Sequence, residues 1–203
     1  MLSFQDFVTS AARSGKVVNL LFEQRVFALV GTLDRIAKVF EQAGISYELV
    51  GGMAVFVHVN KADPTAARNT KDIDLLIRRA DLQRAVDVAQ PAGFVFPHAA
   101  GVDMLLWQGD KNDPIHFVFA GEKTRPEQAH LNPELAPVRE KLHGSGFWVI
   151  QVADLVRMKL SSYRLCDQVQ IQDLDHVGLI TPQVESLLPA DLKDRLSLIR
   201  EQQ

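Results

Sequence analysis

Residues 68–77 of the chain are RNTKDIDLLI. The second half of this stretch, DIDLLI, has the apolar residues of a buried strand, yet it carries Asp72 and Asp74 two positions apart. Side chains with this spacing on a strand point to the same face, so we expect the two carboxylates to lie together. A divalent cation such as Mg²⁺, which prefers oxygen ligands, removes their mutual repulsion. An edge strand with one solvated face is the alternative that the motif alone leaves open.

A glycine turn lies upstream, in LVGGMAVF at residues 49–56. A strand that runs into Gly51 and Gly52 and then into a helix exposes backbone N–H groups at the helix N-terminus. Those groups form an anion site, and glycine lets a phosphate approach the backbone closely. The alternative is a tight strand-to-helix turn that needs glycine only for its positive φ.

The two motifs in this order are more specific than either one alone. A phosphate-binding turn followed by a carboxylate pair is what a nucleoside triphosphate with Mg²⁺ requires. The sequence resembles the DNA polymerase beta-like nucleotidyltransferase superfamily, and most of all its small bacterial branch of antibiotic nucleotidyltransferases and AbiEii-type toxins. The matching residues are the paired glycines Gly51 and Gly52 and the Arg-x-Thr-x-Asp-x-Asp pattern of Arg68, Thr70, Asp72 and Asp74. Residues 155–174 are similar to the helical segment that follows the catalytic sheet in this family, with Lys159 and Asp173 as the best matches.

The resemblance implies an enzyme that transfers a nucleotidyl group from a nucleoside triphosphate to a hydroxyl of a small molecule, tRNA or protein. Asp72 and Asp74 are then catalytic and hold Mg²⁺ as the cofactor. The glycine turn binds the β- and γ-phosphates, and Arg68, Thr70 and Lys159 are the further nucleotide-binding residues. In such a reaction the metal neutralises developing charge and positions the reacting oxygens.

The sequence departs from the family at the third carboxylate, which a neighbouring strand usually supplies. The matching strand is DPIHFVFAG, and the matching position is His116. Histidine is a poor ligand for Mg²⁺, but its pKa range suits it to accept the proton of an attacking hydroxyl. Asp103 and Asp113 lie nearby in the same hairpin, and Asp103 is a second candidate for the missing carboxylate. The alternative is that His116 is a half-buried sheet residue in a degenerate, non-catalytic member of the family.

Two other residues have a plain interpretation beside the functional one. Lys159 lies on a helix with an apolar pattern, and the sequence alone favours a surface lysine whose stem lies along the protein. Cys166 is interpreted as a small buried residue, because no neighbouring base motif marks it as a nucleophile.

The order of periodic segments predicts an α+β fold: a nucleotidyltransferase-like mixed sheet flanked by helices, followed by a helical C-terminal region. We expect a core over residues 1–150 and the helical region over 151–203. The core contains a short helix at 3–12, a longer one at 20–43, strands at 45–50 and 72–78, and a hairpin around the turn DKND at 110–113. A last short strand is expected at 147–150. The segment from 152 is expected to be one helix, or two helices separated near Cys166 and Asp167.

The charge and composition of the chain limit which binding partners and which compartment are expected. The net charge of −3 and pI near 6.1 argue against a generally basic nucleic-acid binder, and no window has the length of a membrane span. One cysteine and no signal-peptide pattern predict a cytoplasmic protein. Three functions follow: a nucleotidyltransferase with a nucleoside triphosphate and an acceptor as partners, a toxin with the same chemistry and an antitoxin partner, or a non-catalytic nucleotide-binding or interaction protein.

Overall fold

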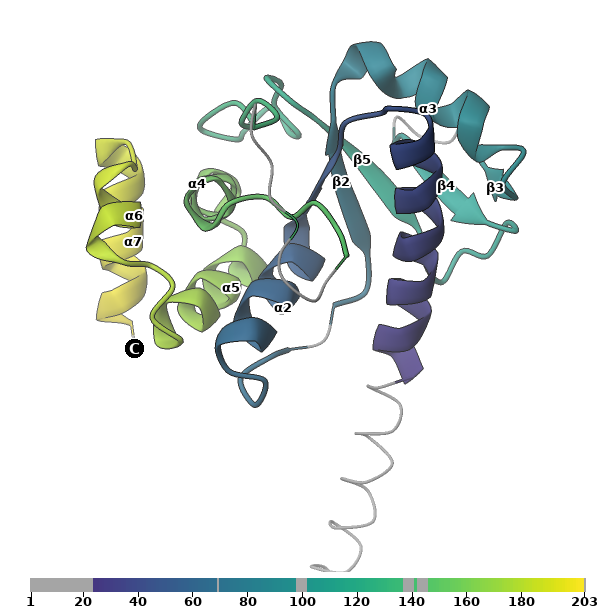
Figure 1. Ribbon diagram of the computed structural model, residues 1–203. Coiled ribbons are helices and arrows are strands. Elements are labelled where there is room, and N and C mark those ends of the chain that lie inside the picture. Colours follow the sequence, from purple (N-terminus) through teal and green to yellow (C-terminus); the bar gives the residue numbers. More distant parts are fainter. Residues whose placement is uncertain (1–23, 69, 98–101, 137–140, 142–145, 203) are drawn as a thin grey trace, which may run out of the picture.

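The computed structural model describes residues 24–68, 70–97, 102–136, 141 and 146–202 (Figure 1). The helix expected at 3–12 lies outside these residues. The described part of the predicted long helix covers residues 24–42, and the helix ends there. The chain then passes through Gly44 into the first strand.

Five strands form one mixed sheet in the order β1-β2-β5-β4-β3. The strands are β1 (Glu48–Val50), β2 (Ile73–Ile77), β3 (Phe94–Val95), β4 (Met104–Trp107) and β5 (Ile115–Phe119). Among these five described strands, β2 and β5 are the parallel neighbours, and β4 and β5 form the predicted antiparallel hairpin. The central pair therefore joins a strand from the first half of the chain to one that follows 38 positions later, from Ile77 to Ile115.

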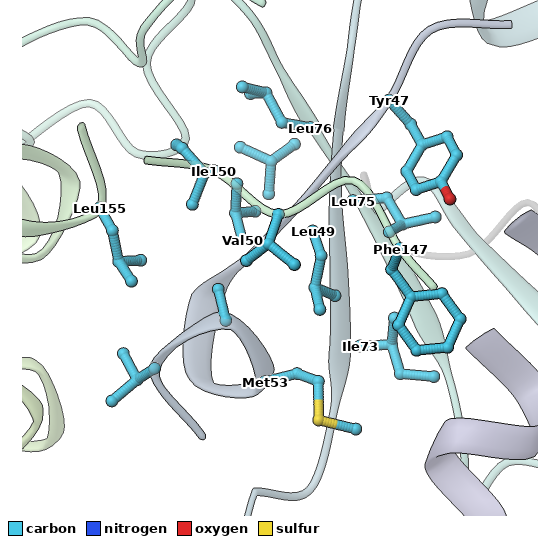
Figure 2. Close-up of a cluster of buried hydrophobic side chains, with 14 of the residues drawn as sticks. Tyr47, Leu49, Val50, Met53, Ile73, Leu75, Leu76, Phe147, Ile150 and Leu155 are labelled. Atoms are coloured by element: carbon cyan, nitrogen blue, oxygen red, sulfur yellow. The ribbon is translucent and has the colours of Figure 1, made fainter. Parts of the chain in front are cut away.

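Both faces of the sheet are covered, which explains why β2 reads as a nearly continuous apolar run. On one face, Phe40 of the N-terminal helix stacks on Phe117 of β5, with ring centroids 6.4 Å apart. On the other face lie α2 (Gly51–Ala62) and α4 (Val152–Ser162) (Figure 1). Figure 2 shows Leu75 and Leu76 pointing to opposite sides of β2, and both are fully buried.

The connections and the C-terminal region are helical. A short turn of 3-10 helix (Arg79–Asp81) leads into α3 (Leu82–Ala89), and α4 is followed by α5 (Leu165–His176), α6 (Pro182–Ser186) and α7 (Ala190–Glu201). Thr181 caps α6 by accepting a hydrogen bond from the Val184 amide. The helices α4, α5 and α7 contact one another, and α4 and α5 also contact α2. The fold is therefore the predicted mixed sheet with flanking helices and a helical C-terminal region.

Two sequence expectations were wrong in detail. The break in the long helical segment lies at Tyr163, whose φ of 53° places it in the left-handed region, and α5 already begins at Leu165. The stretch 147–150 is not a full strand. Its backbone flanks Leu49 of β1 through hydrogen bonds from the Leu49 amide to the Trp148 carbonyl and from the Ile150 amide to the Leu49 carbonyl.

Candidate active site

The glycine turn is shaped around Asp74. The register pairs Val50 with Asp74 across β1 and β2, and the chain turns sharply at Gly51, whose φ is +67°. A Cβ atom at Gly51 would lie 1.8 Å from Oδ2 of Asp74. Glycine is therefore required at this position twice, once by the backbone and once by the carboxylate beside it.

Gly52 and Thr70 form the next layer of the turn. A Cβ atom at Gly52 would lie 2.7 Å from Oγ1 of Thr70 and 3.2 Å from Nε2 of Gln170. The Thr70 hydroxyl in turn donates to the backbone carbonyl of Asp72, at 3.4 Å. The loop before β2 thus packs directly under the start of α2, and it fixes the backbone that carries Asp72.

His116 stands beside Asp74. The two residues are register partners on the parallel strands β2 and β5, and Nδ1 of His116 lies 3.6 Å from Oδ1 of Asp74. Both side chains are about one quarter exposed, at 28% and 26%. The interaction with the Asp74 carboxylate, and more weakly the charge of Asp72, raises the pKa of His116, although burial opposes this. The predicted third position is therefore adjacent to Asp74 in space, as the strand order requires.

Neither aspartate of the hairpin reaches this point. Asp103 lies across from Phe117, one position along from the pair Met104 and His116, so its side chain faces the opposite side of the sheet from His116. Oδ2 of Asp103 instead lies 3.7 Å from Arg79. Asp113 forms an ion pair with Arg25 of the N-terminal helix. The sequence alternative that placed Asp103 at the site is wrong, because the alternation of the strand turns it away.

Arg68 lies at one end of a groove beside the glycine turn. Its Nε atom bonds Oδ1 of Asp173 on α5 at 2.8 Å, and the arginine side chain is 69% exposed. The groove, of about 300 Å³, runs between α2 and α5 from Gly52 to the Arg68–Asp173 pair, and Phe56 lines one of its walls. Arg68 and Asp173, which the family resemblance marks in separate segments, therefore form an ion pair with each other.

Lys159 is not the surface lysine that its helix pattern suggested. Its side chain is only 8% exposed, and Nζ donates to Oδ1 of Asp167 at 3.1 Å. Arg164 binds the same carboxylate in a bidentate manner, from Nε at 2.7 Å and from Nη2 at 3.1 Å. We call Lys159, Arg164 and Asp167 the buried charge cluster, after its central carboxylate, which is 1% exposed.

The pKa of Asp167 reflects this arrangement. Burial alone would raise it, but the hydrogen bond from Arg164 and the charges of Lys159 and Arg164 outweigh burial and lower the pKa to about 2. Asp167 is therefore an anion at neutral pH, and the two cations compensate it as a buried charge requires.

Sequence reasoning missed Arg164 and Gln170, and it placed Cys166 wrongly. All three lie on or next to the first two turns of α5, which packs against α2 at the glycine turn. Cys166 is exposed rather than buried. Oε1 of Gln170 is buried and has no hydrogen-bond partner among the described residues. The helical segment of the resemblance contained these positions, but only the packing of α5 shows which of them face α2.

The described residues offer Mg²⁺ two carboxylates, those of Asp72 and Asp74. Asp74 points at the glycine turn with His116 as its ion-pair partner, and Asp72 has none among the described residues. Over the same part of the chain, no group of three or more His, Cys, Asp or Glu side chains is arranged to hold a metal ion. Two carboxylates beside a glycine turn fit a Mg²⁺ ion that would take its other oxygens from a ligand and water, and they do not fit a preformed metal cage.

Comparison with known proteins identifies the family. Residues 10–156 match the family model described as "Uncharacterised nucleotidyltransferase". The chain belongs to this nucleotidyltransferase family. The match includes the glycine turn, both aspartates and His116, and it ends before Lys159 and the rest of the buried charge cluster. A search of curated protein sequences gave no match.

Solved structures are similar to this chain at low sequence identity, and the first of the two below has a similar fold. The Megavirus polyadenylate synthase is 9% identical with a TM-score of 0.55, over 89% of this chain and 39% of that one. The antibiotic-resistance factor ANT(2'')-Ia is 11% identical with a TM-score of 0.47, over 87% of this chain and 84% of that one.

None of the described helices has both the length and the apolar character needed to cross a membrane.

Proposed function

We propose that this protein is a Mg²⁺-dependent nucleotidyltransferase that moves a nucleoside monophosphate from a nucleoside triphosphate to a hydroxyl acceptor. The single observation that supports this most is the contact between the glycine turn and Asp74, where the carboxylate fills the space that a side chain at Gly51 would need. An anion site and a metal-binding carboxylate are thereby held within one van der Waals contact of each other. Residues 1–150 form the catalytic core in this proposal, and residues 151–203 pack against it.

Each site residue has a defined task. The N–H groups at Gly51 and Gly52 hold the β- and γ-phosphates at the start of α2. Asp72 and Asp74 would hold Mg²⁺, which neutralises charge on the triphosphate when it is bound. Thr70 supports Gly52 and fixes the backbone of Asp72, while Arg68 and Lys159 stay candidates for contacts with the nucleotide.

The transfer is an in-line displacement. The acceptor oxygen forms a bond to the α-phosphorus, the bond from that phosphorus to the β-phosphate oxygen breaks, and pyrophosphate leaves with the bonding electron pair. In this proposal His116, the register partner of Asp74 on the adjacent strand, takes the hydroxyl proton. The exposed and free Cys166 fits a reducing compartment, and we place the reaction in the cytoplasm.

The test is transfer of label from each of the four α-labelled nucleoside triphosphates, with and without Mg²⁺, to extracts of small molecules, tRNA and protein. We expect Mg²⁺-dependent labelling of one acceptor class that is lost in Asp72→Ala and Asp74→Ala. Labelling that is unchanged in both variants would contradict the proposed site. Growth arrest on expression of the wild type, abolished in Asp74→Ala, would identify the toxin form of the activity, and an antitoxin is then the expected protein partner.

A non-catalytic nucleotide-binding protein is the second candidate, and one observation favours it. His116 lies where the family resemblance expects a third carboxylate, and Asp103 faces away from this position. If His116 marks a lost activity, His116→Asp should create or raise transfer in a chain that otherwise only binds nucleotide. If the wild type already transfers label, and His116→Asn reduces that transfer, this second candidate is wrong.

A further inference from the structure

The start of α5 brings a positive group to the acidic side of the site. Arg164 precedes α5 directly, and its side chain is 45% exposed although it bonds a buried carboxylate. Figure 1 shows α5 beside α2, the helix that starts at the glycine turn, and contacts between the two helices hold them together. The amide of Gln170, on the second turn of α5, lies against Gly52.

The guanidinium of Arg164 is held on one edge and open on another. Asp167 accepts from Nε and Nη2, and it also accepts from the Arg164 backbone amide at 3.2 Å. A guanidinium has five N–H groups, so three remain after these two side-chain bonds. Among the described residues, no further acceptor bonds them. The hydrogen bond with Asp167 is the main cause that raises the pKa of Arg164, and the charge of Asp74 adds the smallest contribution.

Lys159 has a different position in the same cluster. Its side chain is almost completely buried. Its ammonium donates to Oδ1 of Asp167, the same oxygen that Nη2 of Arg164 bonds. Asp167 therefore lies between a buried cation and an exposed one. Two cations on one carboxylate restrict its rotamer, and a fixed carboxylate in turn fixes the fork of the arginine that it binds.

We propose that Arg164 binds the triphosphate of the substrate, and that Asp167 and Lys159 are positioning residues that hold Arg164 for this contact. The proposal rests on the proposed function, because it assigns a substrate contact at the same site. An arginine fork matches phosphate geometry in a bidentate manner, and its weak hydration makes it suited to a partly buried anion contact. Lys159 then acts on the nucleotide only through Asp167 and Arg164.

The first experiment measures binding by calorimetry on the full chain, with Mg²⁺ and either each nucleoside triphosphate or inorganic tripolyphosphate. We expect Arg164→Met to weaken binding by about 10- to 100-fold, the effect of losing hydrogen bonds to a charged group. Arg164→Lys should recover part of the loss. The matched control is Arg78→Met, since Arg78 is a comparably exposed arginine at the far end of β2 that pairs with Asp81.

The outcomes separate this inference from the proposed function. If the wild type binds no triphosphate, both are wrong. If the wild type binds and Arg164→Met binds equally well, the nucleotidyltransferase proposal stands and the role of Arg164 is overturned. Weakening by Arg78→Met to the same degree would show a general charge effect, and it would also overturn the specific contact.

The second experiment tests the positioning role with a double-mutant cycle on the same binding constants. Lys159→Gln, which keeps an N–H donor for Asp167, should weaken binding in the wild type and have no further effect in Arg164→Met. Equal effects of Lys159→Gln in both backgrounds would show that Lys159 contacts the phosphates directly and would overturn its positioning role. Thermal unfolding of each variant identifies losses that come from folding, and Lys159→Arg replaces Lys159→Gln if the latter does not fold.

Discussion

Two groups of charged side chains lie near each other in this protein, and their degree of pairing differs. The buried charge cluster surrounds Asp167 with four hydrogen bonds from Lys159 and Arg164. The acidic pair of Asp72 and Asp74 has one ion-pair partner among the described residues, His116 at 3.6 Å. A compensated carboxylate supports the fold, whereas partly exposed and almost unpaired carboxylates beside the glycine turn can accept a cation or another ligand. The predictions below test that difference.

The largest effect is expected from Asp167→Asn, and it should be an effect on stability. The substitution leaves Lys159 buried without a counter-charge, and breaking a buried pair in this way costs about 3–5 kcal/mol. Chemical denaturation should show the loss as a lower midpoint with an unchanged slope. Asp34→Asn, which removes an exposed carboxylate paired with Lys38, is the control and should barely change the midpoint. A small effect of Asp167→Asn would show that the cluster does not stabilise the fold.

Asp74→Asn should give the opposite pattern. Transfer activity should fall by roughly 10²–10³-fold, the size of effect seen when a charge-stabilising group is removed from an active site. The melting temperature should stay within about 2 °C of the wild type, because the side chain is partly exposed and loses only its contact with His116. Asp87→Asn on α3 is the control for activity. A large loss of stability without a loss of activity would reverse the assignment of the two clusters.

Acid should weaken the fold through Asp167. The pKa of this carboxyl is about 2 in the folded protein and 3.8 when the group is free, so its contribution to stability is present above about pH 4. It should be lost as the pH falls from about 4 towards 2, by roughly 2 kcal/mol in the free energy of unfolding. The measurement is denaturant unfolding at a series of pH values. The same series on Asp167→Asn should lack this part of the pH dependence, and an identical slope in both proteins would contradict the assignment.

Gly51→Ala tests the glycine turn itself, and a matched glycine makes its effect on stability interpretable. Gly178 has a φ of +74°, close to the +67° of Gly51, but a Cβ atom there meets nothing within 4 Å. Gly178→Ala should therefore cost only the backbone strain of about 1–2 kcal/mol. Gly51→Ala should cost more, because the new methyl displaces the Asp74 carboxylate. The additional loss of unfolding free energy at Gly51, relative to Gly178, should shrink when Gly51→Ala is combined with Asp74→Ala. Equal losses in Gly51→Ala and Gly178→Ala would mean that the turn tolerates a methyl group beside the Asp74 carboxylate.

Most of the fold was predictable from the sequence, which also proposed the residues of the candidate site. The glycine pair, the alternation of Asp72 and Asp74 and the hairpin around 110–113 are local patterns, and each follows from strand or turn geometry within a few residues. Together these patterns resemble those of nucleotidyltransferases. The match to the family model confirms that assignment, and the fold agrees with it. The roles of the single site residues stay predictions that the experiments above test.

Tertiary structure decided the contacts that join distant segments. The parallel register of β2 and β5 places His116 beside Asp74 and turns Asp103 away, and no local pattern contains that register. The packing of α4 against α5 buries Lys159 and pairs it with Asp167, while the helical pattern alone favoured a surface lysine. Periodicity reports which face of an element is apolar, but the partner of a buried charge depends on which elements pack together, and this is determined only when the chain folds.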